Sequence, residues 1–90
     1  VRFLKKQAKA ELTRAVTRHC ETLRVNCTGI SVKDTRSRWG SCTVDGQLSF
    51  SWRLIMAPPE VLDYVAAHEC AHLREMNHSA KFWALVARCC

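Results

Sequence analysis

The 90-residue sequence has no long hydrophobic run, and its longest apolar stretches are as short as residues 54–58. A membrane-spanning helix needs about 20 consecutive apolar residues, so none is predicted. The chain starts at Val1, and no apolar stretch follows its early basic residues, so an intact signal peptide is also missing. From these absences we expect no membrane contact and a cytoplasmic location.

Cys-x-x-Cys pairs are absent although the chain has six cysteines, which argues against an all-cysteine zinc knuckle. Six cysteines in so short a chain are compatible with a disulfide scaffold, but the lack of a secretory signal opposes that reading. Cys20, Cys42 and Cys70 lie in apolar or structured segments, where a free thiol behaves as a small hydrophobe. We therefore expect reduced thiols.

Internal repeats and low-complexity segments are missing as well. Hydrophobic residues make up 48% of the chain, which is enough for one packed core. A chain of this length forms one domain at most. Because it starts at Val1 and stops at Cys90, we expect residues 1–90 to be a single domain taken from a longer protein.

Positive charge is abundant but uneven. The net charge is +6, with +7 in residues 1–53 and −1 in residues 54–90. A basic half can attract an anionic partner such as nucleic acid, while a solvated helix face is the plainer explanation. The basic side chains that would lie together on one helix are Lys5, Lys6, Lys9, Arg14 and Arg18.

The first segment, residues 3–24, is predicted to be a helix because apolar residues recur at spacings of three and four without glycine or proline. Residues 26–29 provide its stop. The apolar positions are Leu4, Ala8, Leu12, Ala15, Val16, Cys20 and Leu23.

Residues 30–54 change to a period of two, which is typical of strands. Asp45-Gly46 predicts a tight hairpin turn, and the alternation that follows predicts a last strand over residues 47–54. We expect two or three antiparallel strands. The large rings of Trp39, Trp52 and Trp83 are expected in the core.

Two helices complete the chain. Pro58-Pro59 opens the first, which is predicted to extend to about Met76, with Asn77 as a left-handed cap. Ser79 is the predicted N-cap of the last helix. The order of helix, strands, helix and helix indicates an α+β fold.

Three of the four histidines fall within residues 68–78. His68 and His72 are four residues apart and therefore share one face of a helix. Glu69 follows the first histidine, where its carboxylate can approach a metal-bound water without being a ligand. This is the His-Glu-x-x-His pattern of zinc hydrolases, so a Zn²⁺ cofactor is predicted.

Glu75 and His78 are the candidates for a third ligand. Glu75 shares the face of His68 and His72, but it lies too far along a straight axis for one ion. A helix break at Asn77 would bring His78 back to the metal, so His78 is preferred. Three imidazoles leave a fourth position open for water, as in catalytic zinc sites.

Together with these motifs, a set of further segments resembles the YgjP-like metallopeptidase family, also described as predicted metal-dependent hydrolases. The resemblance covers about residues 30–88. The segments that carry it are residues 38–42, 48–54, 57–65, 68–79 and 82–83.

The resemblance implies a zincin-like fold in which His68, His72 and His78 bind zinc and Glu69 acts as general base on the zinc-bound water. It also implies kinship with SprT-like and WLM proteases, which act on DNA-bound proteins. Relatives carry additional sequence on both sides, so residues 1–90 are expected to be the catalytic portion of a longer hydrolase.

Three functions are compatible with these observations. The first is a zinc metallopeptidase whose extended substrate adds to residues 47–52 as an edge strand. The second is a nucleoside triphosphate pyrophosphatase acting on UTP, as described for some family members, with Arg36 and Arg38 contacting phosphate. The third is a non-catalytic, zinc-structured module that binds nucleic acid through the basic helix.

Overall fold

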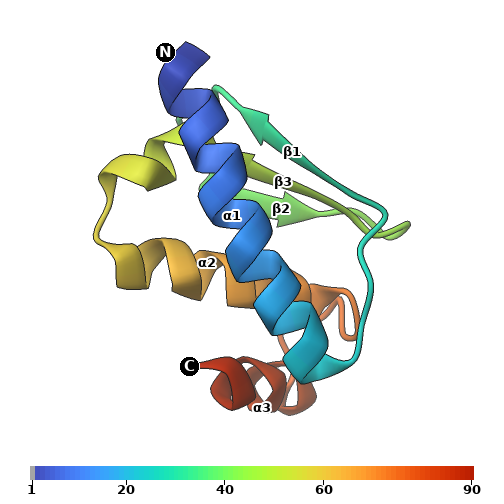
Figure 1. Ribbon diagram of the computed structural model, residues 1–90. Coiled ribbons are helices and arrows are strands. Elements are labelled where there is room, and N and C mark those ends of the chain that lie inside the picture. Colours follow the sequence, from blue (N-terminus) through green and yellow to red (C-terminus); the bar gives the residue numbers. More distant parts are fainter. Residues whose placement is uncertain (1) are drawn as a thin grey trace.

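The computed structural model describes residues 2–90 and confirms the α+β order of elements (Figure 1). The chain has three α-helices and a three-stranded sheet, and a 3-10 helix, η1, follows the last strand. The elements are α1 (Arg2–Leu23), β1 (Gly29–Lys33), β2 (Gly40–Cys42), β3 (Gln47–Ser51), η1 (Trp52–Met56), α2 (Pro59–His72) and α3 (Ala80–Cys89).

Helix α1 buries the apolar stripe that its spacing predicts, including Leu12, Val16 and Leu23. It ends before the predicted stop at residues 26–29, because Arg24 adopts a left-handed conformation with φ 55°. The backbone N–H of Val25 then donates to the carbonyl of residue 20 at 3.0 Å, closing the helix as a Schellman motif.

The sheet has the order β1-β3-β2, with β2 and β3 antiparallel around the predicted turn. Gly46 supplies the positive φ of 90° that this turn requires. The expectation of a purely antiparallel sheet is wrong, because β1 pairs with β3 in parallel. Strand β3 inserts between β1 and β2, so β1 meets a strand that points in its own direction (Figure 1).

Strand β3 is also shorter than predicted, since it ends at Ser51 and not at residue 54. The Ser51 hydroxyl accepts a hydrogen bond from the backbone N–H of Arg53 and caps η1. The indole N–H of Trp52 donates to Asp34 at 3.0 Å, which holds the ring in the core with 7% of its surface exposed. A local capping bond therefore overrides the alternation of the sequence.

Helix α2 begins at Pro59 as predicted but ends at His72, four residues before Met76. The N–H groups of Leu73 and Arg74 bond to carbonyls three residues back, at 3.0 and 3.1 Å, so the helix tightens and stops. The predicted left-handed cap at Asn77 is wrong, because within residues 2–90 only Arg24 and Gly46 have positive φ. The helix therefore ends before Asn77.

Helix α3 is capped as predicted, with the Ser79 hydroxyl accepting from the N–H of Phe82. Phe82 and Val86 face the core, whereas Trp83 lies 45% exposed. Trp39 is 51% exposed, so the expectation that all three tryptophans are core residues holds for Trp52 only. Trp83 follows Phe82 directly and therefore lies off the buried stripe of the helix.

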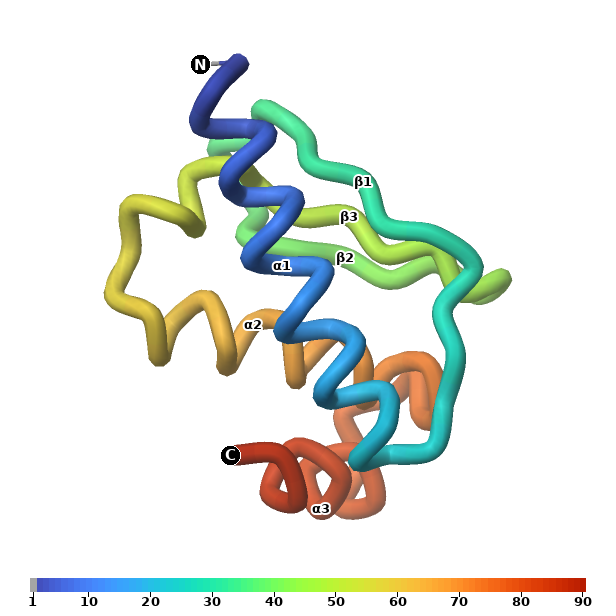
Figure 2. The backbone as a smooth tube through the Cα atoms, viewed as in Figure 1, coloured from blue at the N-terminus to red at the C-terminus, as the bar shows by residue number. Residues whose placement is uncertain are grey.

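Helix α1 crosses in front of both the sheet and α2, whereas α3 packs against α1 and α2 at the end of the molecule away from the sheet (Figure 1). The connection from α1 to β1 runs along the side of the molecule, away from α3 (Figure 2). Leu48 and Phe50 of β3 point into the core. All six cysteines are free thiols. Across residues 2–90, none of the helices has the length and apolar character needed to cross a membrane.

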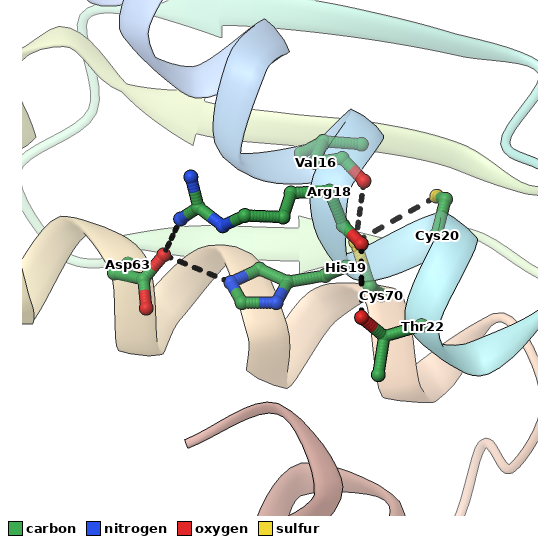
Figure 3. Close-up of polar contacts among 7 residues, drawn as sticks. All are labelled: Val16, Arg18, His19, Cys20, Thr22, Asp63 and Cys70. Atoms are coloured by element: carbon green, nitrogen blue, oxygen red, sulfur yellow. Dashed lines mark hydrogen bonds and ion pairs between the residues drawn. The ribbon is translucent and has the colours of Figure 1, made fainter.

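Polar contacts fasten α1 to α2 (Figure 3). His19, with 2% of its surface exposed, donates through Nε2 to Asp63 at 2.9 Å, and Arg18 pairs with the same carboxylate. The next residue of α1, Cys20, faces Cys70, which lies two turns after Asp63 on α2, and their Sγ atoms are 3.9 Å apart. Both sets of contacts join α1 to α2.

Candidate metal centre

The far end of α2 carries a cluster of three histidines. His68 and His72 lie in its last two turns, and the loop that follows brings His78 back to them. The ring centroids are 4.8–5.4 Å apart, and one nitrogen from each ring lies within 4.8 Å of the others. Glu75, the alternative third ligand, does not belong to this group.

The three histidines converge because helix α2 terminates at His72 and not at residue 76. The backbone carbonyl of Glu75 accepts a hydrogen bond from Nδ1 of His72 at 3.1 Å. Because a carbonyl can only accept, Nδ1 carries the proton and the unprotonated Nε2 of His72 is left as a ligand. The same turn that stops the helix therefore fixes one tautomer and starts the return to His78.

A buried phenylalanine ring forms the floor beneath all three imidazoles. The Phe82 ring is fully buried, and its centroid lies 5.0 Å from His68, 4.4 Å from His72 and 4.9 Å from His78. The ring of His78 also stacks against Trp83 at 5.9 Å. Helix α3 thus holds the histidines through aromatic packing.

Glu69 lies next to this cluster and is nearly buried, with 6% of its surface exposed. Its carboxylate accepts a hydrogen bond from Nδ1 of His68 at 3.1 Å. Burial raises the pKa of Glu69, and this outweighs the lowering effect of His72 and His78. Burial also lowers the pKa of His68, as does His78, and so favours the neutral form that binds metals.

Strand β2 runs directly beside Glu69. A Cβ atom placed on Gly40 would lie 3.1 Å from Cγ of Glu69 and 3.1 Å from the ring of Phe50. The charge of Glu69 also adds to burial in raising the pKa of Cys42 to about 11. Glycine at position 40 is what allows the strand to approach the carboxylate this closely.

The outer edge of β2 is unpaired within residues 2–90, since β2 pairs with β3 alone. The carbonyl of Trp39 accepts from Ser51, and the N–H of Thr43 donates to Gln47. Because antiparallel bonding alternates along a strand, the backbone groups of Gly40 point to the free edge. The prediction that residues 47–52 form the edge strand is wrong, since β3 is the central strand.

The histidine cluster fits a divalent metal ion. Zinc bonds of about 2.0–2.1 Å in a tetrahedron place ligand nitrogens roughly 3.4 Å apart. The nitrogens here are within 4.8 Å of each other, so modest rotations of the rings bring them to that separation. A set of three neutral imidazoles is typical of zinc, and it leaves one coordination position free.

Two exposed aromatic rings border His68. Tyr64 lies one turn earlier on α2, with its ring centroid 6.2 Å from that of His68. Trp83 of α3 lies 6.0 Å from His68. Tyr64 is 43% exposed, although its helical spacing predicts a packed core aromatic. Both rings are therefore half-exposed beside the histidine cluster.

The predicted phosphate contacts lie elsewhere. Arg36 and Arg38 are exposed in the loop between β1 and β2. They line a hollow of about 100 Å³ together with Trp39 and Arg53, and none of its lining residues belongs to the histidine cluster. A ligand pocket usually encloses about 300–1,000 Å³, so this hollow is too small for a nucleotide.

The basic helix is partly occupied by contacts within the chain. Lys9 donates to the carbonyl of Ile30 at 2.8 Å, Arg14 pairs with Glu11, and Arg18 pairs with an acidic residue of α2. Only part of the positive charge of α1 is left to attract an anionic partner, which favours the plainer explanation of a solvated helix face.

Sequence reasoning missed two residues of this site. Nothing in the sequence assigns Phe82 a role at the site, although its place three residues after the N-cap Ser79 brings its ring next to that of His78. Gly40 gave no signal of its proximity to Glu69, because 28 positions separate them and only the tertiary fold joins them.

Comparison with known proteins gives a family and similar solved structures, among them two metallopeptidase zymogens. A family profile described as YgjP-like, metallopeptidase domain, matches residues 1–90. The metallopeptidase zymogen of Pyrococcus abyssi, abylysin, superimposes with TM-score 0.76 and 17% identity, covering 86% of this chain and 77% of that one. The metallopeptidase zymogen of Methanocaldococcus jannaschii, jannalysin, gives TM-score 0.71 and 21% identity, covering 83% and 77%. No match is found among curated proteins by sequence comparison.

Proposed function

The chain belongs to the YgjP-like metallopeptidase domain family and is a hydrolase of metallopeptidase type, and from this premise we propose that His68, His72 and His78 hold zinc while Glu69 is the general base. The observation that carries the proposal is the convergence of three imidazole nitrogens within 4.8 Å. A bound zinc ion polarises a carbonyl and acidifies water.

Glu69 is suited to the transfer of a proton. Its carboxylate is next to the histidines, and burial raises its pKa, which makes it a better proton acceptor when ionised. In the proposed reaction Glu69 takes a proton from the attacking water and later gives it to the leaving amine. Nδ1 of His68 donates to the same carboxylate and so orients it.

We propose that the peptide substrate lies along the free edge of β2. An extended peptide can add to an unpaired strand through backbone hydrogen bonds, which makes recognition largely independent of side chains. The outward backbone groups of Gly40 lie beside Glu69, so a peptide bonded there has its scissile carbonyl near the histidines.

Two substitutions test the proposal on the zinc-loaded protein. Glu69→Gln keeps the shape of the side chain but removes the base, so we expect unchanged zinc content and a loss of peptide hydrolysis of at least about 100-fold. His78→Ala removes one ligand, so we expect zinc affinity to fall by more than about tenfold. Zinc is measured by metal analysis after dialysis, and turnover on a mixed peptide library by mass spectrometry.

Matched controls lie in the same loop. Glu75→Gln changes a carboxylate outside the histidine cluster, and Asn77→Ala changes the neighbour of His78. Both should keep zinc and turnover close to the wild-type values. Full turnover by Glu69→Gln would remove Glu69 as the base, and full zinc affinity in His78→Ala would remove that ligand. Release of pyrophosphate from UTP without peptide cleavage would replace the peptidase assignment.

A further inference from the structure

We propose that Tyr64 and Trp83 are specificity-determining residues, which receive an apolar side chain of the peptide residue next to the scissile bond. This inference rests on the proposed peptidase function and deepens it by naming a substrate class. Both rings border His68, with centroid separations of 6.2 and 6.0 Å, and the two belong to different helices.

The exposure of the two rings distinguishes them from packing residues. Phe82, the neighbour of Trp83, is fully buried and supports the histidines. Tyr64 and Trp83 remain 43% and 45% exposed, so half of each ring is free to touch a bound molecule. Exposed aromatic rings that adjoin a reactive centre are a usual means of binding apolar groups.

The position of the rings selects the part of the substrate that they touch. A carbonyl that reacts at the histidines lies within a few ångströms of His68, so the side chain adjoining that carbonyl is the one that can reach Tyr64 and Trp83. Ring faces bind aromatic and branched aliphatic groups well, whereas a small polar side chain gains little from them. A preference for an apolar residue at one side of the cleaved bond follows.

Peptide hydroxamates test the preference without a known substrate, because the hydroxamate group binds the metal and one side chain can be varied. On the zinc-loaded protein, isothermal titration compares a phenylalanine hydroxamate, a serine hydroxamate and acetohydroxamate, which has no such side chain. We expect the phenylalanine compound to bind about tenfold more tightly than the serine compound. Trp83→Ala and Tyr64→Ala should each reduce this ratio at least about threefold. Tyr64→Ala should also leave acetohydroxamate affinity close to the wild-type value, because Tyr64 does not pack on His72 or His78.

Phe3→Ala is the control, since Phe3 is 75% exposed in the first turn of α1 and has no part in the site. It should leave the ratio unaltered. Trp83→Phe keeps an aromatic ring and should restore most of the preference. If Trp83→Ala loses zinc, Tyr64→Ala still decides, because Tyr64 contacts only His68 among the three histidines. Equal binding of the phenylalanine and serine compounds overturns the inference, whereas failure to bind acetohydroxamate overturns the proposed function.

Discussion

Two thiols in this chain differ sharply in their environments. The pKa of Cys20 is lowered, chiefly by its contact with the thiol of Cys70, whose sulfur lies 3.9 Å away. The pKa of Cys42 is raised to about 11, first by burial and then by the charge of Glu69. Since the thiolate is the nucleophile, these two residues should react at different pH.

We therefore expect iodoacetamide to label Cys20 at a lower pH than an ordinary thiol, while Cys42 stays unlabelled at pH 8. Peptide mapping by mass spectrometry after brief alkylation at several pH values measures both sites. Cys70→Ala removes the hydrogen bond and should move the Cys20 profile to higher pH. A Cys20 profile centred above pH 9 in the wild type would contradict this account.

At the residue scale the sequence predicts the histidines better than the aromatic rings. His68 and His72 share a helix face by spacing alone, so their proximity needs no tertiary information. The exposure of Trp83 and Tyr64 depends on which elements pack around them, and large rings are usually buried. Trp83 gave one local signal, since it lies off the apolar stripe that passes through Phe82 and Val86.

At the scale of elements, the contact between α1 and α2 depends on one carboxylate. Asp63 accepts from the buried ring of His19 and pairs with Arg18 (Figure 3). Asp63→Ala leaves the Nε2 proton of His19 without its acceptor, so we expect the free energy of unfolding to fall by about 1–3 kcal/mol. Urea unfolding followed by circular dichroism measures the change.

Glu11→Ala is the control for this substitution. It removes an exposed partner of Arg14 on α1, and such pairs contribute only about 0.2–0.5 kcal/mol. Equal losses for Asp63→Ala and Glu11→Ala would mean that the contact of Asp63 with His19 adds nothing beyond surface electrostatics.

Helix α3 affects the metal centre through Phe82. Phe82→Leu keeps an apolar side chain but loses the flat ring against which three imidazoles pack. We expect zinc affinity to fall about tenfold and the visible absorption of the cobalt-loaded protein to change, because the three histidines lose the aromatic ring that packs against them.

Val86→Ala separates the role of Phe82 from general packing. Val86 is buried one turn further along α3, and its truncation should lower stability by about 1–3 kcal/mol without changing the cobalt spectrum. If Phe82→Leu leaves both spectrum and affinity unchanged, the ring has a packing role alone.

Elements defined by local signals were predicted well, and the arrangement of strands was not. The Asp45-Gly46 turn joins β2 to β3 by neighbouring residues, so the pairing is visible in the sequence. The partner of β1 is decided by which strand fits beside it in the core, and its parallel pairing has no local signature. The approach of β2 to Glu69 has no local signature in the sequence either, because the two are joined only by the tertiary fold.

At the scale of the whole molecule, the proposed metal site predicts that metal binding raises the stability of the fold. Zinc bound to the folded chain stabilises it by RT ln(1 + [zinc]/Kd), which is about 2.7 kcal/mol at one hundred times Kd. For a domain of 90 residues, we expect Tm to rise by roughly 10–20 °C. Thermal unfolding by circular dichroism, with zinc and with a chelator, measures this difference.

His78→Ala should lose most of the zinc-dependent rise in Tm, while its Tm in chelator should stay near the wild-type value because His78 is exposed. Asn77→Ala should keep the full rise. A rise that is the same in His78→Ala and in the wild type would show that zinc stabilises the chain at another site.

The short span of the histidine cluster has a consequence for the order of events during folding. The three histidines fall within eleven consecutive residues, so closing the loop between them costs little entropy. Bringing Gly40 beside Glu69 needs contacts between distant parts of the chain, which form more slowly. The three proposed metal ligands can therefore come together before strand β2 reaches Glu69, so the metal-binding half of the proposed site would form ahead of its substrate-binding half.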